Sequence, residues 1–119
     1  MVTKIISHRG RTSNESPDNT LQSIGDAIDF NIDMVEFDVR RTRDGQIVCF
    51  HDAEIGNKSL MSLSFSEATE MNPLIPTLEQ VLRSAKGKIQ VDIDVKETGY
   101  ENEIINILLD YFEYDDFIM

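Results

Sequence analysis

The chain contains two histidines, and each lies at the end of a predicted strand, directly before a charged residue. His8 precedes Arg9, and His51 precedes Asp52. An imidazole exchanges protons near neutral pH, so a pair of histidines is typical of general acid and base catalysis. A structural role for each ring is the alternative. The position of both rings after strands, each beside a charge that can orient or tune the ring, favours catalysis.

Two carboxylates follow the period of a β-strand. Glu36 and Asp38 alternate with Val35, Phe37 and Val39, so we expect both acids on one face of the strand and the apolar side chains on the other. In an enclosed site two carboxylates repel each other and lose hydration, unless a cation or strong donors neutralise them. The alternative is a sheet whose polar face simply lies in water.

A second stretch repeats the pattern and favours the metal site. Asp92, Asp94 and Lys96 alternate with branched apolar residues, so a third carboxylate can reach the same cavity from a neighbouring strand. Oxygen ligands without a cysteine cluster favour Mg²⁺ or Ca²⁺ over zinc. A divalent cation beside two imidazoles suggests phosphoryl chemistry, in which Arg9 holds the phosphate and Lys96 neutralises developing charge.

The elements that must position these residues are predicted from apolar periodicity and from helix caps. We expect strands over residues 4–7, 33–42, 46–51 and 89–96 and from residue 117, and helices over 21–28, 77–86 and 100–112. Asp18 or Asn19 is expected to cap the first helix, after a loop over 10–19. The turn at 43–45 predicts a short antiparallel extension, and 52–72 reads as a connection with at most a helical turn at 66–70.

Strands that alternate with helices predict an α/β fold with a parallel sheet. No Gly-x-Gly-x-x-Gly follows the first strand, and polar residues at the ends of successive strands are typical of a TIM-type (β/α)₈ barrel. A complete barrel needs about 200 residues or more, so we expect residues 1–119 to form one domain that is the N-terminal half of a barrel. An unpaired final strand predicts either a fragment of a longer protein or a half-barrel that forms a homodimer.

The composition limits the partners. A net charge of −11 disfavours nucleic acid or an anionic membrane as the main partner. The sequence has no long apolar run and no secretory signal, and the single Cys49 cannot form an internal disulfide. We therefore expect a cytoplasmic protein that acts on a small molecule and does not insert into membranes. The arginines Arg11, Arg40, Arg41 and Arg43 fit a solvated surface better than a lipid headgroup contact.

Six short motifs in order resemble those of the glycerophosphodiester phosphodiesterase family. They are His8-Arg9-Gly10, Pro17-Asp18-Asn19-Thr20-Leu21, Val35-Glu36-Phe37-Asp38-Val39 with Thr42-Arg43-Asp44-Gly45, His51-Asp52, Ile75-Pro76-Thr77-Leu78 and Asp94-Val95-Lys96. None of the motifs is specific alone, but their order and spacing across residues 8–96 are. They match the N-terminal half of that family's TIM barrel.

The resemblance implies a role for each matched position. His8 and His51 match the acid/base pair, Glu36, Asp38 and Asp94 the ligands of a divalent cation, Arg9 a phosphate contact, and Lys96 a lysine of the family. Family members split glycerophosphodiesters into an alcohol and glycerol 3-phosphate, with the neighbouring glycerol hydroxyl as nucleophile.

The sequence also departs from the family pattern. Asp18 and Asp94 stand where glutamate is usual, and the segment between His51 and Pro76 is short for a family that often inserts a substrate-covering subdomain there. Two alternatives follow: a non-catalytic truncated barrel that binds a cation or a partner chain, and a related phospholipase that acts on another phosphodiester.

Overall fold

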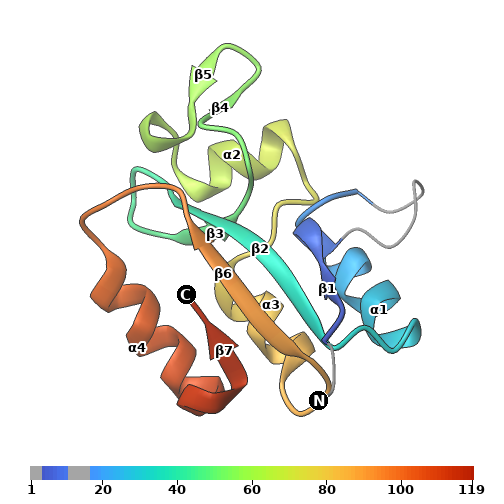
Figure 1. Cartoon of the computed structure of the whole chain (residues 1–119). Helices are drawn as coiled ribbons and strands as arrows, with labels where there is room; N and C mark the ends of the chain where they lie inside the picture. The colour runs from blue at the N-terminus through green and yellow to red at the C-terminus, as the bar shows by residue number, and fades with distance from the viewer. Residues whose placement is uncertain (1–3, 11–16) are drawn as a thin grey trace.

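The computed structural model describes residues 4–10 and 17–119. Its main sheet contains four parallel strands in the order β1 (Ile6–Ser7), β2 (Met34–Arg41), β6 (Gln90–Val95) and β7 (Phe117–Ile118) (Figure 1). β2 and β6 form its centre and pair over six residues, which places Glu36 opposite Asp92 and Asp38 opposite Asp94. The predicted alternation of strands and helices around a parallel sheet is confirmed.

Three helices cover one face of this sheet (Figure 1). They are α1 (Leu21–Asp29), α3 (Leu78–Ala85) and α4 (Glu101–Tyr111), and the core lies between them and the sheet. Val35, Phe37 and Val39 are fully buried in that core. Because side chains alternate along a strand, Glu36 and Asp38 project from the opposite face, as the sequence predicts.

β3 (Ile47–Cys49) is the expected antiparallel extension, and it changes the route by which His51 reaches the site. One edge of β2 pairs with β6. On the other edge, β1 pairs with residues 34–35 and β3 with residues 39–41. His51 therefore follows a strand that runs back along β2, and it does not follow a parallel barrel strand.

The segment between β3 and α3 is more ordered than the sequence suggests. It contains a hairpin of β4 (Glu54–Ile55) and β5 (Lys58–Ser59), followed by helix α2 (Phe65–Met71). The expectation of a plain connection was wrong for the hairpin. The helical turn expected at 66–70 is confirmed within α2, which a capping box of Ser64 and Glu67 starts. The segment also has its own apolar cluster, made of Val48, Ile55, Leu60, Leu63, Ala68 and Ile75.

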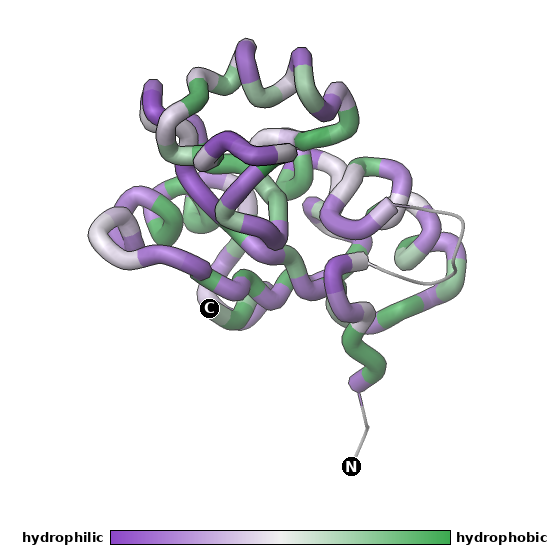
Figure 2. Tube along the Cα trace, turned by 90° about the horizontal axis from the view of Figure 1, so that it is seen from above, coloured by the Kyte–Doolittle hydropathy of each residue, from purple (hydrophilic) through white to green (hydrophobic). Residues whose placement is uncertain are grey.

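Within residues 4–10 and 17–119, the remaining elements are three 3₁₀ turns, at His8–Gly10, Leu60–Ser62 and Tyr114–Asp116. Hydrophobic and hydrophilic residues alternate over short distances along the trace (Figure 2). Among the described residues, no helix is long and apolar enough to cross a membrane. The predicted loop over 10–19 falls in part on residues 11–16, which lie outside the described residues.

Candidate active site

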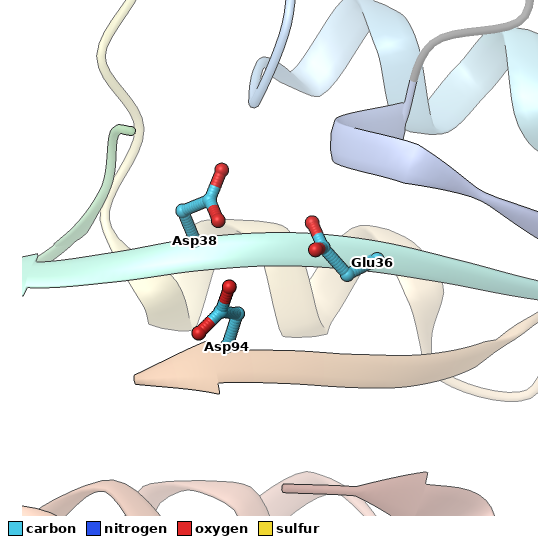
Figure 3. Close-up of side chains that lie close together, drawn as sticks. All are labelled: Glu36, Asp38 and Asp94. Carbon is cyan, nitrogen blue, oxygen red and sulfur yellow. The ribbon is translucent and has the colours of Figure 1, made fainter. Parts of the chain in front are cut away.

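Three carboxylates from the two central strands lie together on the face that the helices leave open (Figure 3). One oxygen of each of Glu36, Asp38 and Asp94 lies within 4.8 Å of the others. Asp38 is fully buried, while Glu36 and Asp94 are half-buried. The three residues that the sequence places on this face thus form one cluster of oxygen ligands.

The cluster carries an electrostatic cost. Burial raises the pKa of Glu36, and the nearby Asp38 carboxylate raises it further, while a hydrogen bond from the Arg9 main chain opposes both effects. The pKa of Asp92 is also raised, by burial and then by Asp94. Asp92 pairs with Glu36 in the sheet but does not join the cluster of three ligand atoms. Removing carboxylates from water disfavours their charged form, so the cluster favours a cationic partner.

Two basic side chains lie against the cluster. Nζ of Lys96 is 2.8 Å from Oδ2 of Asp94 and 3.4 Å from Oδ1 of Asp38, and Nε of Arg9 is 3.4 Å from Oδ2 of Asp38. The hydrogen bond to Asp94 is the main cause that raises the pKa of Lys96. Two buried polar atoms of the site remain without a hydrogen bond among the described residues in spite of these ion pairs. Oδ1 of Asp38 accepts none of good geometry, and Nε of Arg9 donates none.

The backbone around Arg9 is held in an unusual conformation. Arg9 has φ +55° and Gly10 has φ +73°, and a Cβ at residue 10 would lie 2.4 Å from Oγ of Ser23. Glycine is therefore required beside α1, both for its conformation and for its size. This close approach carries the Arg9 guanidinium to Asp38 and to Asp18, which lies 3.5 Å away.

Asn19 is a site residue whose role the sequence analysis missed. Its Nδ2 donates to Oδ2 of Asp38 at 3.1 Å, and its Oδ1 accepts from the Asp38 main-chain N–H at 3.0 Å. Its own N–H donates to the Arg9 carbonyl at 2.8 Å. The predicted capping of α1 by Asp18 or Asn19 was wrong. The cap is Thr20, paired with Ser23, because the Asn19 amide is held by Asp38.

The two histidines approach the same edge of β2 from opposite directions. His8 follows β1, and its Nε2 lies 3.7 Å from Oε2 of Glu36, with 70% of its side chain exposed. His51 follows β3, and the preceding residue donates its N–H to the Asp38 carbonyl. Nδ1 of His51 lies 2.8 Å from Oδ1 of Asp52. When Nδ1 donates to that carboxylate, Nε2 is the nitrogen left to exchange a proton.

One predicted surface arginine belongs to the site. Arg40 was expected with the solvated arginines, but only 12% of its side chain is exposed, and it forms an ion pair with Glu97 at 3.3 Å. The alternation along β2 carries the signal that identifies it, since residues 36, 38 and 40 share one face. Arg41 and Arg43 do form more exposed ion pairs, with Glu103 and Glu67. Arg11 lies outside the described residues.

Comparison with known proteins identifies the family to which this chain is similar. Residues 8–107 match the model of the "Glycerophosphoryl diester phosphodiesterase family". The chain is 27% identical to the glycerophosphodiester phosphodiesterase of Bacillus altitudinis, over 99% of this chain and 57% of that protein. It is also 27% identical to that of Caldanaerobacter subterraneus subsp. tengcongensis, over 93% of this chain and 54% of that protein.

The solved structures confirm the predicted fold. The crystal structure of a glycerophosphodiester phosphodiesterase from Thermotoga maritima is 25% identical and superposes with a TM-score of 0.85, over 98% of this chain and 53% of that one. The protein is thus an α/β chain with the fold of about half of a TIM-type barrel, and it spans about half the length of the relatives it matches. Because the family match extends from His8 through the whole carboxylate cluster, the chain belongs to the glycerophosphoryl diester phosphodiesterase family.

Proposed function

We propose that this chain supplies the metal-binding and acid/base half of an active site that hydrolyses glycerophosphodiesters to an alcohol and glycerol 3-phosphate. The observation that carries the proposal is the convergence of Glu36, Asp38 and Asp94 within 4.8 Å. Family membership gives the reaction class, and the positions of the two histidines beside β2 supply groups that can exchange protons.

The residues present fit a divalent cation. All three ligands are carboxylates, which favour a hard ion such as Mg²⁺ or Ca²⁺, and the buried Oδ1 of Asp38 accepts no hydrogen bond from the described residues. The lone thiol, Cys49, is buried in the helix-covered core, where burial raises its pKa. We propose Glu36, Asp38 and Asp94 as the ligands. When bound, such an ion withdraws charge from a phosphate oxygen and lowers the pKa of a coordinated hydroxyl.

The side chains around the cluster divide the remaining tasks. Arg9 presents a planar guanidinium that suits a phosphate, and Lys96 adds a second positive charge beside Asp94. His8 and His51 act as the acid/base pair: one imidazole takes a proton from the attacking hydroxyl, and the other gives one to the leaving oxygen. Either ring is equipped for either role, because each has one nitrogen close to a carboxylate.

The hydrolysis of a glycerophosphodiester, measured with and without Mg²⁺ or Ca²⁺, tests the proposal. We expect activity to require the divalent ion and to disappear with a chelator. His8→Ala and His51→Ala should each lower kcat by about 10²-fold or more if the imidazoles transfer protons. Unchanged rates in both variants would refute the acid/base assignment.

The length of the chain favours one second candidate. Since it spans about half of its relatives, a barrel half that binds a cation without turnover is the alternative. Calorimetry with each metal and the activity assay, both on this chain and on a protein extended past Met119, separate the two, because binding without turnover in both would support the alternative. A sphingomyelin or inositol phospholipid offered in the same assay tests the phospholipase alternative.

We further propose that a second half-barrel completes the site, either the C-terminal half of the same protein or a second copy of this chain. β1 and β7 end the parallel sheet, each with one strand neighbour among the described residues. The single domain over 1–119 and the cytoplasmic location stay predictions.

A further inference from the structure

We propose that Arg40 is a positioning residue for His51, held in place by Glu97. The inference rests on the proposed function, since it concerns one of the two proposed acid/base histidines. Nε and Nη2 of Arg40 both donate to the main-chain carbonyl of His51, at 2.9 and 2.7 Å. Two parallel donors on one oxygen fix that carbonyl in direction as well as in distance.

Glu97 fixes the guanidinium in turn. Its Oε2 lies 3.3 Å from Nη1 of Arg40, and its Oε1 accepts from the Arg41 main-chain N–H and from the Tyr100 hydroxyl. The Arg40 and Glu97 side chains are only 12% and 15% exposed. A charged pair withdrawn this far from water is held in one geometry by its hydrogen bonds, unlike an exposed pair.

The location of the pair links it to the carboxylate cluster. Arg40 stands two residues after Asp38 on β2, and Glu97 lies two residues beyond the end of β6. The pair therefore joins the two strands that carry the carboxylates to the chain segment that carries His51. His51 lies beyond β3, where the main chain leaves the sheet toward the β4–β5 hairpin. The fork from Arg40 holds the segment at this point.

The test compares the same conservative substitution at neighbouring positions. Arg40→Lys keeps the positive charge beside Glu97 but cannot place two parallel donors on one oxygen. Arg41→Lys is the matched control, because Arg41 forms an exposed ion pair with Glu103 and stacks over the Tyr100 ring. We expect Arg40→Lys to lower kcat by about 10-fold or more, with a smaller change in KM, since a displaced catalytic group loses rate more than binding. Arg41→Lys should leave kcat within about twofold of the parent by the same argument.

A second readout does not depend on turnover. The chain has two histidines, so its imidazole NMR spectrum contains two sets of signals, which His8→Ala assigns. Arg40→Lys should shift or broaden the His51 signals and leave those of His8 unchanged, and Arg41→Lys should alter neither. If the protein is inactive even with its second half-barrel present, the proposed function fails, and the spectra alone decide whether Arg40 positions His51.

Several outcomes would overturn the inference. His51 signals that stay the same in Arg40→Lys would do so, as would shifted signals with unchanged kcat in an active protein. If Arg40→Lys fails to fold, as judged by circular dichroism, Glu97→Gln replaces it. That variant keeps the size of the side chain and removes the charge that holds the guanidinium. Like Arg40→Lys, it should shift or broaden the His51 signals and lower kcat. An effect on Tm alone would show that the Arg40–Glu97 pair is purely structural.

Discussion

At the scale of single residues, the site gathers charge that the fold alone would not favour. Glu36, Asp38 and Asp94 lie close together on the open face of the sheet, and the pKa values of Glu36 and of the neighbouring Asp92 are raised, chiefly by burial. Unfavourable electrostatics of this kind are typical of functional sites. Two substitutions measure separately how much stability the carboxylate cluster costs and how much stability the contacts around it contribute.

We expect Glu36→Gln to stabilise the protein at pH 7 in the absence of divalent cations. The folded protein holds the Glu36 proton to a higher pH than the unfolded chain, because the pKa of Glu36 is raised above 4.5. The folded state therefore binds more protons in that window, and stability falls as pH rises through it. Glutamine does not ionise, so the variant avoids this loss of stability. Its Tm should therefore exceed that of the parent at pH 7, and the difference should vanish below about pH 4.

Thermal unfolding between pH 3 and pH 8 checks this expectation. Glu70→Gln is the control, because Glu70 is exposed on α2, and it should change Tm little at either end of the range. A Glu36→Gln variant that is less stable than the parent at pH 7 would contradict the argument.

Asn19→Gly should destabilise the protein by about 1–3 kcal/mol, the usual cost of leaving buried polar groups without partners. The amide of Asn19 satisfies both the carboxylate and the main-chain N–H of the fully buried Asp38. Glycine adopts the positive φ of +56° without strain, so what remains besides the lost side chain is the greater freedom of glycine in the unfolded chain. Asn31→Gly is a matched control at the same φ on an exposed residue, and urea unfolding should find it near neutral. Equal effects at both positions would contradict a special role for Asn19.

At the scale of elements, local sequence patterns predicted the strands and helices that depend on neighbouring residues. Alternation in residues 35–39 and 89–95 located the two central strands, and the Thr77–Gln80 capping box located α3. Contacts between distant segments escaped prediction. Asn19 reaches Asp38 and Arg40 reaches the His51 carbonyl only after the chain has folded, and no periodicity encodes such pairs. The hairpin of β4 and β5 was missed because its strands are two residues long.

The turn that joins β2 and β3 is tied to α2, and this contact should depend on pH. Oδ1 of Asp44 accepts hydrogen bonds from the Thr42 hydroxyl and from the Phe65 main-chain N–H. These bonds, first that from Thr42, lower the pKa of Asp44 from its ordinary value of 3.8. A lowered pKa adds stability above the ordinary value, and that stability is lost as pH falls through the folded-state value. Asp44→Asn should thus lower Tm at pH 7, with a deficit that shrinks below about pH 4. A deficit that stays constant from pH 5 to pH 3 would contradict this origin.

At the scale of the whole molecule, the sheet presents apolar side chains on the face that a barrel would enclose. Ile6 pairs with Met34 and Ile118 pairs with Asp92, so both project from the carboxylate face, and each residue is about half exposed, at 49% and 52%. Both belong to the strands that end the parallel sheet in the part of the chain that the structure describes. Exposed apolar side chains beside unpaired strand edges favour association.

A second half-barrel seated on this face would bury Ile118, so Ile118→Ser should weaken association without lowering the stability of the monomer. Sedimentation velocity over a range of concentrations measures the association, and circular dichroism measures Tm. Met61→Ser is the control, since Met61 is 57% exposed but lies in the segment between β3 and α3, away from the sheet edges. The unsubstituted chain should associate as concentration rises, Ile118→Ser should remain monomeric over the same range, and Met61→Ser should behave as the parent does. A chain that stays monomeric throughout, or a Met61→Ser variant as impaired as Ile118→Ser, would refute the docking of a second copy on this face, because neither result could arise from apolar contact between two copies at the edges of the sheet.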